Sequence, residues 1–371
     1  MTTPAAPSPT PRTEHVGSLL RPDALLQARR RHAAGTIDAD ELAAAEDAAI
    51  EEALARQAAV GVGVVGDGEF RRTDFRAGFA DAVSGLREEV RETAWRGGTA
   101  VVPTRRWHVE ARVARERPIA LGEALFVREH TTSPFKVTLP SAGYVAERFF
   151  DAGAESPAYG SARELGGAFV EILRAEFADL IEAGVPYVQV DNPGYATFLD
   201  DAARHRVAAE GRDADQAFRD MLDSDVALLG SIPRDRGTIV ALHVCRGNNA
   251  GQWLHQGGYE PIAEQLFGAL PVDRLLLEFD DDRSGSLDVL RHVPAPKIAV
   301  LGLISTKTAA IEDPESLLRR LEEASRHIDP GRLAISPQCG FATHAEGGNP
   351  LSEDEQYRKL EVAVQVAERF F

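Results

Sequence analysis

The chain has 371 residues, 44% of them hydrophobic, and its formal net charge is −17. A chain of this length and composition can bury a large core, which excludes disorder over most of it. The excess of negative charge repels phosphate groups, so we expect neither nucleic acid nor a membrane surface as a partner. A small-molecule substrate is the expectation that remains.

The first residues, 1–12 (MTTPAAPSPTPR), are rich in Pro, Thr and Ala and predict a flexible tail. They lack the charged and apolar regions of a signal peptide, and no later apolar run reaches the roughly 20 residues of a spanning helix. We therefore expect a cytoplasmic protein. Cys245 and Cys339 are the only cysteines. A reducing cytosol disfavours a disulfide between them, which leaves a metal or catalytic role to consider.

Short apolar runs rich in β-branched residues recur along the chain and are typical of buried strands. Eight strands are predicted, at Glu14–Ser18, Val62–Asp67, Phe135–Pro140, Tyr187–Asp191, Thr238–Cys245, Arg274–Phe279, Lys297–Leu303 and Arg332–Pro337. Longer segments between these strands carry apolar residues at helical spacing. The predicted helices include Ala39–Gln57, Ser161–Ala183, Asp213–Leu229, Ile262–Ala269, Pro314–His327 and Glu353–Phe370.

A strand followed by a helix, repeated about eight times, indicates an α/β protein with a parallel sheet. The length is somewhat above the ~250 residues typical of a (β/α)8 barrel. We therefore predict a single TIM barrel domain over residues 13–371. Residues from about Thr93 to His130 account for the surplus, as a β-hairpin inserted before the third strand.

In such a barrel the reacting groups stand where strands end. The fifth predicted strand ends in His243-Val244-Cys245, and its alternation points the first and third of these side chains the same way. The sixth ends at Glu278 and the eighth runs into Cys339. This donor set favours zinc over magnesium or calcium. The alternative is that the cysteines are small buried hydrophobic residues and the histidine belongs to the core.

Six segments of the chain resemble the catalytic half of cobalamin-independent methionine synthase and its single-barrel relatives, which include epoxyalkane:coenzyme M transferase. In the family's order they are HVGSLLRP (15–22), GDGEFRRTDF (66–75), VQVDNP (188–193), LHVC (242–245), LEFDDDRSG (277–285) and SPQCGF (336–341). The resemblance covers nearly the whole chain from Glu14 onward. It implies that Zn²⁺ is held by His243, Cys245, Glu278 and Cys339.

The same resemblance implies that Ser18, Glu69 and Asp191 hold the amino-acid part of a thiol substrate. We assign Asp191 to catalysis as well as to substrate binding. His15, near Ser18, is a further candidate for the substrate pocket, with a structural role as its alternative. An acidic residue at a strand end is often only a helix cap, which is the alternative for Asp191.

A zinc ion held by these residues would suit the activation of a thiol. A free thiol has a pKa of about 8.5, so forming the nucleophilic thiolate near pH 7 costs about 2 kcal/mol. Coordination to zinc deprotonates the sulfur and removes that cost. Glu278 is expected to be the labile ligand that yields its place to the substrate sulfur. The carboxylates of Glu69 and Asp191 can accept hydrogen bonds from a substrate ammonium group.

Three positions depart from the family pattern. Ala142-Gly143-Tyr144 stands where the family has a tryptophan that stacks on folate, and Ile304 where it has the histidine that protonates the leaving folate. Asn192 replaces the acidic residue of the usual Asp-Glu-Pro. These departures argue against methyltetrahydrofolate as the donor.

The leading hypothesis is therefore zinc-dependent transfer of a methyl or small alkyl group to a thiol such as homocysteine, without folate. The partners would be a small-molecule thiol and an alkyl donor, with a corrinoid protein as one candidate. The first alternative is an alkyltransferase of the epoxyalkane:coenzyme M type. The alternative of another class is a metal-free enzyme like uroporphyrinogen decarboxylase, or a binding protein without turnover. The sequence leaves the donor, the acceptor thiol and the oligomeric state open, and an oligomer is compatible with it.

Overall fold

The computed structural model describes residues 10–97, 101–151, 158–343, 345–347 and 349–371. Most of the predicted tail, residues 1–9, lies outside these ranges. Within the rest of that tail, the Arg12 guanidinium donates to the carbonyls of Gly331 and Leu333. These contacts hold residue 12 against the segment that leads into the last strand.

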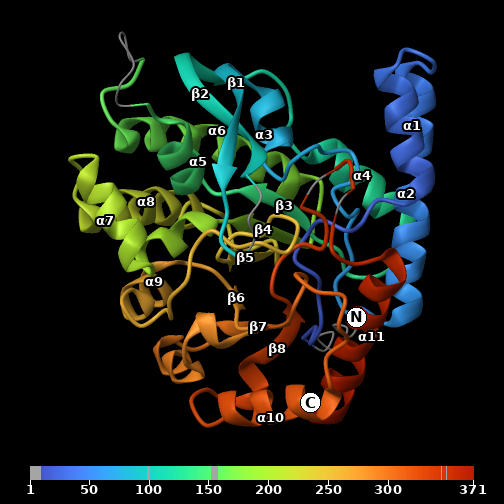
Figure 1. Ribbon diagram of the computed structural model, residues 1–371, viewed down its shortest axis with the longest axis vertical. Coiled ribbons are helices and arrows are strands. Elements are labelled where there is room, and N and C mark those ends of the chain that lie inside the picture. The colour runs from blue at the N-terminus through green and yellow to red at the C-terminus, as the bar shows by residue number, and fades with distance from the viewer. Residues whose placement is uncertain (1–9, 98–100, 152–157, 344, 348) are drawn as a thin grey trace, which may run out of the picture.

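Six parallel strands form the central sheet, with helices arranged around it (Figure 1). They are β3 (Val137–Pro140), β4 (Tyr187–Asp191), β5 (Ile239–Val244), β6 (Arg274–Glu278), β7 (Ile298–Ile304) and β8 (Leu333–Pro337). The strands pair in chain order. Their carboxyl ends therefore lie at one edge of the sheet, where the chemistry of α/β proteins is usually found.

The first two predicted strands, Glu14–Ser18 and Val62–Asp67, form only isolated parallel bridges. Thr13 bridges to Ile335 of β8, Glu14 to Val64, and Val65 to Phe135 just before β3. Glycines at positions 17, 63 and 66 lower the strand propensity of both segments. The sequence predicts full strands here, whereas the structure forms bridges, and closure into an eight-stranded barrel stays a prediction.

Helices cover the outer face of the sheet. They are α1 (Asp23–Ala33), α2 (Ala39–Val60), α3 (Ala77–Ala82), α4 (Leu121–His130), α5 (Ala142–Phe149), α6 (Ala162–Glu182), α7 (Asp201–Ala209), α8 (Ala214–Leu229), α9 (Ala263–Ala269), α10 (Pro314–Ala324) and α11 (Glu353–Phe370). Short 3-10 helices lie at Pro193–Phe198, Asp282–Ser284, Leu287–His292 and Pro330–Arg332. None of the helices in the described ranges is both long and apolar enough to cross a membrane.

Local sequence explains where the predicted helices begin. Asp38 and Ser352 each form a capping box, before α2 and α11. Asp313 caps α10, whose first residue is Pro314. The six predicted helices agree with α2, α6, α8, α9, α10 and α11 to within three residues at each end.

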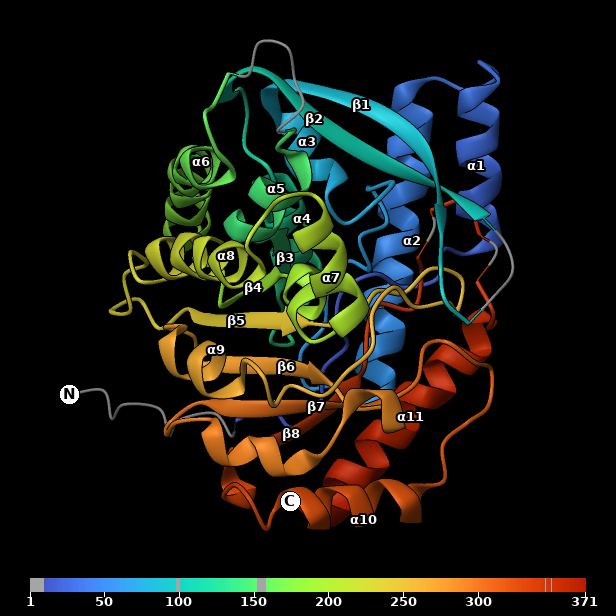
Figure 2. The ribbon, with the colours of Figure 1, turned by 60° about the vertical axis from the view of Figure 1, so that its left-hand side comes forward.

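An antiparallel hairpin, β1 (Val83–Ala94) with β2 (Val101–Arg115), precedes β3. Figure 2 shows it as a long ribbon along the top of the molecule. The predicted bounds, Thr93–His130, are wrong at both ends, because the first arm lies before Thr93 and residues 121–130 form α4. β1 carries charged residues on both faces. Its sequence therefore lacks the alternation of apolar and polar residues by which a strand is predicted.

Glu176 of α6 holds the segment that follows β2. Its fully buried carboxylate accepts the backbone N–H groups of Ile119 (2.8 Å) and Ala120 (2.7 Å) and pairs with Arg115 (2.5 Å). Without this acceptor, the two buried N–H donors lose their partner, and Arg115 keeps only its ion pair with Asp179.

We therefore expect Glu176→Ala to lower the free energy of unfolding by about 3–5 kcal/mol, the range for removing one partner of a buried pair. Equilibrium urea unfolding measures this change. Glu171→Ala is the matched control, because Glu171 lies exposed on the same helix and pairs with Arg174. It should change the unfolding free energy by less than about 0.5 kcal/mol. Equal effects of the two variants would contradict the role of Glu176.

Candidate functional site

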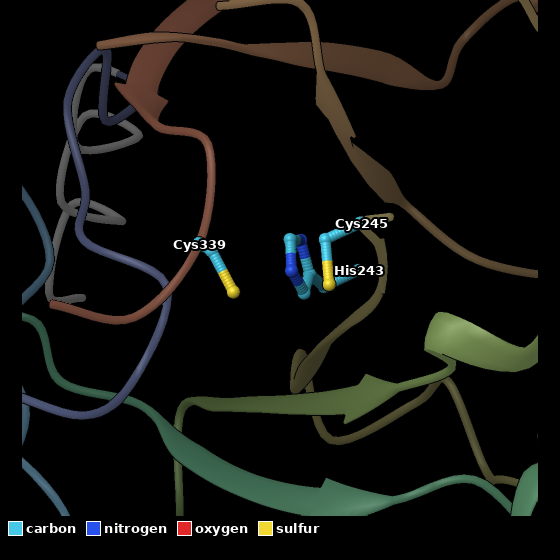
Figure 3. Close-up of side chains that lie close together, drawn as sticks. All are labelled: His243, Cys245 and Cys339. Carbon is cyan, nitrogen blue, oxygen red and sulfur yellow. The ribbon is translucent and has the colours of Figure 1, made fainter. Parts of the chain in front are cut away.

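Three side chains that favour metal ions meet at the carboxyl ends of β5 and β8. His243 lies in β5, Cys245 follows its last residue, and Cys339 follows β8 by two residues. One ligand atom from each lies within 4.8 Å of the others. Figure 3 shows the Cys339 sulfur directed toward the pair from β5. The structure thus brings together three of the four predicted ligands, although about 95 residues of sequence separate His243 from Cys339.

The three groups perturb one another's proton affinity. A shared hydrogen bond with Cys339, and then the nearby His243, lower the pKa of the Cys245 thiol well below its ordinary value. The same hydrogen bond and burial raise the pKa of Cys339. Burial lowers the pKa of His243, but Cys245 and the charges of Asp191 and Glu278 outweigh it and raise that pKa. One thiol of the pair is therefore poised to be a thiolate, which is the form that binds metal.

Glu278, the fourth predicted ligand, does not join this group of ligand atoms. Its Oε1 accepts from Lys307 Nζ at 3.1 Å, and its Oε2 accepts the backbone N–H of Arg246 at 2.6 Å. Lys307 is a residue that the sequence analysis missed. It lies three residues after β7, and the strand-end rule that selected the other candidates would also have selected it.

A cavity of about 530 Å³ opens beside the three residues. Ser18, Glu69 and Asp191, the predicted substrate-binding residues, all line it together with His243, Cys245 and Cys339. The β1–β2 hairpin supplies another wall, with Thr93, Trp95 and Arg105 among its residues. The volume suits a small molecule.

Backbone geometry fixes Ser18 and Glu69 in this wall. Glu69 has a left-handed backbone (φ 58°), which is uncommon for a residue with a side chain and typical of functional sites. A Cβ at Gly17 would lie 2.6 Å from Glu69 Oε1, so a larger residue there would displace the Glu69 carboxylate. Thr138 Oγ1 donates to the same oxygen at 2.7 Å. Ser18 Oγ donates to the carbonyl of Ala342 at 2.7 Å, which joins it to the loop after Cys339.

Asp191 ends a buried chain of polar side chains. Gln189 Nε2 donates to Asp191 Oδ1 at 2.7 Å, while Gln189 Oε1 accepts from Lys136 Nζ at 2.7 Å. Lys136 also donates to Glu14 at 2.7 Å, and Glu14 pairs with Arg274 at 2.9 Å. Burial, and then the charge of Glu69, raise the pKa of Asp191 to about 7, although His243 and Gln189 oppose the shift. Asp191 is thus held in a fixed position with a pKa near neutrality.

His15 is not among the residues that line the cavity in the described part of the chain, and its place in the substrate pocket stays a prediction. The ring is buried against Gly66, at which a Cβ would lie 3.2 Å from it. Burial and then the charge of Lys136 lower the pKa of His15 to about 3. Its structural alternative, which the sequence left open, fits these contacts.

The positions that depart from the family pattern differ in their surroundings. Tyr144 lines the cavity and stacks on Phe75, with ring centres 5.7 Å apart, so an aromatic surface is present there. The tryptophan that the segment 142–144 lacks is thus replaced by another aromatic ring at the cavity. Ile304 is fully buried in the hydrophobic core. Asn192 turns to Asp225, to which it donates at 2.8 Å.

Comparison with known proteins shows the family. The model described as "Cobalamin-independent synthase, Catalytic domain" matches residues 11–369. "Uncharacterized protein YxjH" of Bacillus subtilis (strain 168) is 33% identical over 362 residues, which cover 96% of this chain and 93% of the relative. "Methionine synthase" of Sulfurisphaera tokodaii is 25% identical over 330 residues, covering 89% of this chain and 85% of that protein.

Solved structures agree with this result. The crystal structure of the putative vitamin-B12 independent methionine synthase from Listeria monocytogenes superimposes with a TM-score of 0.75 at 25% identity. The match covers 97% of this chain and 98% of that one. The likeness in fold therefore extends over nearly the whole chain.

The depressed pKa of His15 makes stability depend on pH. Between pH 6.5 and 3 this histidine binds a proton in the unfolded chain but not in the folded protein. The free energy of unfolding therefore decreases as the pH falls through this window. We expect this residue to contribute a slope of up to about 1.4 kcal/mol per pH unit in that window. His15→Leu should flatten the slope, measured by urea unfolding at pH 4–7, whereas substitution of the exposed His32 is the control. An unchanged slope in His15→Leu would contradict the buried neutral state.

Proposed function

Because the chain belongs to the family of cobalamin-independent methionine synthase catalytic domains, we propose that it transfers a methyl or small alkyl group to a thiol such as homocysteine. Members of this family are methyltransferases. The observation that carries the proposal is the group of His243, Cys245 and Cys339 at the wall of a cavity that Glu69 and Asp191 also line.

Zinc fits the donors at this site. Both ring nitrogens of His243 are buried and lack a normal hydrogen bond to any other described residue, which is costly unless a ligand satisfies one of them. Two sulfur donors beside an imidazole favour zinc among the common divalent ions. When bound, zinc would lower the pKa of the substrate thiol and supply the nucleophilic thiolate at neutral pH.

The residues around the metal donors bind and orient the substrate in this proposal. Glu69 and Asp191 would accept hydrogen bonds from the ammonium group of an amino-acid thiol. Ser18 Oγ, which donates its hydrogen to the carbonyl of Ala342, would accept a hydrogen bond from the same ammonium group. Trp95 of the hairpin limits water near the reacting sulfur, because it stands in the cavity wall.

We extend the proposal to the fold of the chain and to the place of the protein in the cell. We infer a (β/α)8 barrel with the hairpin inserted before its third strand, supported by the bridges that link β8 through residues 13–14 and 64–65 to Phe135. We also infer a cytoplasmic enzyme whose partners are small molecules or a carrier of the alkyl group, such as a corrinoid protein.

The donor is proposed not to be methyltetrahydrofolate. Ile304 is buried in the core and offers no proton, and general acid help is typically worth 10²–10⁴-fold. A methylcorrinoid or a sulfonium has a better leaving group and needs no acid. Ring strain would drive the opening of an epoxide, whose alkoxide would take its proton from water. Tyr144 and Phe75 supply the aromatic surface on which an extended donor could stack.

The experiment that tests the function incubates zinc-loaded protein with homocysteine or coenzyme M and a panel of alkyl donors. Mass spectrometry detects the thioether. We expect methionine from homocysteine with at least one activated donor, and none with methyltetrahydrofolate. Product only from coenzyme M and an epoxide would favour the alternative alkyltransferase. Robust turnover with methyltetrahydrofolate would contradict the proposed donor class.

We expect purified protein to contain about one zinc ion per chain, and Cys245→Ser and Cys339→Ser to lose it, because a hydroxyl is a far weaker zinc ligand than a thiolate. Elemental analysis of each variant measures the loss, and circular dichroism checks that each is folded. Full zinc content and activity in either serine variant would refute the ligand assignment and raise the metal-free alternative.

We expect Glu69→Gln and Asp191→Asn to raise the KM for homocysteine about tenfold or more, since each removes a charge-assisted hydrogen bond to the ammonium group. Zinc content should stay unchanged. Glu346→Gln is the matched control, because Glu346 lies exposed at the same cavity. If homocysteine kinetics stay unchanged in both variants, the amino-acid pocket is wrong.

A further inference from the structure

Arg148 is a cavity arginine without a carboxylate partner in the described part of the chain. It lies in α5, one turn after Tyr144, and both side chains line the cavity. Its half-buried guanidinium forms no ion pair with another described residue, and the adjacent Glu147 pairs instead with Arg212 at 2.6 Å. The chain has 58 acidic and only 41 basic residues, so carboxylates are plentiful. The guanidinium of Arg148 is therefore available to an anion in the cavity.

Positive charge exceeds negative charge around His255, which lines the same cavity. Burial is the main cause that lowers the pKa of this histidine to about 4. Among the nearby charges Asp200 opposes that shift, whereas the guanidinium groups of Arg206, Arg148 and Arg96 add to it. Asp200 already pairs with Arg96 at 2.6 Å. An anion would therefore be attracted to this part of the cavity, although the net charge of the chain is −17.

His255 also offers a hydrogen-bond donor. The residue is only 7% exposed, and its buried Nδ1 has no partner among the described residues. Its Nε2 lies 3.5 Å from Thr197 Oγ1, which can donate to it and leave the proton of the neutral ring on Nδ1. A buried donor without an acceptor is costly, so a ligand oxygen at Nδ1 would be stabilising.

Trp95 of the hairpin offers a third donor in this wall. Its indole N–H is buried and likewise lacks an acceptor in the described ranges. The ring lies beside the loop that carries His255, because a Cβ at Gly247 would lie 3.0 Å from Trp95 and 3.1 Å from Leu254. Donors from α5, from the hairpin and from the loop after β5 thus line one cavity.

We propose, on the basis of the transfer function above, that Arg148, His255 and Trp95 bind an oxyanion carried by the alkyl donor. The donor is then a molecule with a carboxylate, sulfonate or phosphate group, whose paired oxygens match the fork of a guanidinium. The anion is assigned to the donor because Arg148 follows the aromatic surface of Tyr144 by one helical turn. Glu69 and Asp191, the residues proposed for the acceptor, are acidic and would repel it.

This requirement narrows the candidate donors. A sulfonium that also bears a carboxylate meets it, and so does a corrinoid with a nucleotide phosphate. A simple epoxide or an uncharged methyl donor does not meet it. Methyltetrahydrofolate bears carboxylates too, so its exclusion in the proposed function rests on the buried aliphatic side chain of Ile304 and not on this subsite.

The test measures the binding of acetate, methanesulfonate and methylphosphonate, which carry the same methyl group on three different oxyanions. Saturation-transfer NMR of the methyl protons, at a series of probe concentrations, gives a Kd for each probe with the full chain. We expect at least one probe to bind. Arg148→Met should weaken that binding about tenfold or more, as expected for the loss of a charge-assisted hydrogen bond. The probe with the lowest Kd identifies the class of anion.

Two further variants separate the subsite from a general effect of charge. Arg163→Met is the matched control, because Arg163 is exposed on α6 and pairs with Asp220 at 3.0 Å. It removes one positive charge and should leave the Kd unchanged. His255→Leu should weaken binding by a factor of about two to ten, since it removes a neutral donor. Circular dichroism establishes that each variant is folded.

The metal and the acceptor are tested as competing sites for the probe. Binding should persist in Cys245→Ser, which is expected to lose zinc, because the subsite contains no metal donor. Loss of binding in that variant would mean that the probe sits on the metal. Homocysteine should not displace the probe from zinc-loaded protein, whereas displacement would assign the anion to the acceptor thiol.

The inference is overturned if no probe binds to the unchanged protein, or if Arg148→Met and Arg163→Met behave alike. It is also overturned if the probe is lost with the metal or displaced by homocysteine. None of these results changes the zinc content or the formation of a thioether, so the proposed function would stand. A protein without zinc or transferase activity that still binds the probe through Arg148 would instead refute the proposed function and the assignment of the anion to a donor.

Discussion

The parallel register of the central sheet decides what the rest of the molecule can do. Because β3 to β8 pair in chain order and in one direction, the residues at their carboxyl ends meet at one edge. His243 and Cys245 from β5 thereby come within reach of Cys339 after β8. The same register places Asp191 opposite His243, since the two residues are partners in the β4–β5 ladder. A slip of one residue would turn these side chains away from each other.

This arrangement buries charged side chains beneath the site, and the structure pairs each of them with an opposite charge. Glu14, Lys136 and Arg274 are almost fully buried, and each has an oppositely charged partner among the other two. Gln189 joins this group to Asp191. Such networks contribute little net stability compared with an apolar core, but removal of one member leaves an unpaired buried charge. Their value here is that they fix the position of a carboxylate beside the proposed metal site.

The hairpin and the loops complete the site by shaping the cavity. Arg96 at the end of β1 exchanges two backbone hydrogen bonds with Trp253, and its guanidinium pairs with Asp200 at 2.6 Å. These contacts fasten the hairpin to the loop that follows β5. Trp95, the neighbour of Arg96, consequently stands in the cavity wall. The cavity therefore lies between the strand ends and the hairpin.

Alternation, capping residues and strand-end positions are local signals, so the sequence predicted the six strands of the sheet, six of the helices and the grouping of His243, Cys245 and Cys339. Ser18, Glu69 and Asp191 were implied by the resemblance to the family, and they line the same cavity. The surroundings of individual side chains could not be predicted from the sequence, because they depend on contacts between segments that are far apart in the chain. Glu278 was assigned as a ligand by its place at a strand end and by the resemblance, whereas only the structure shows that its carboxylate accepts from Lys307, 29 residues away. His15 was a candidate for the pocket because it lies near Ser18, with a structural role as the alternative, and only the structure shows its ring packed beside Gly66. The direction of a side chain at a strand end depends on its hydrogen-bonding and packing partners, and the tertiary structure determines which residues those are.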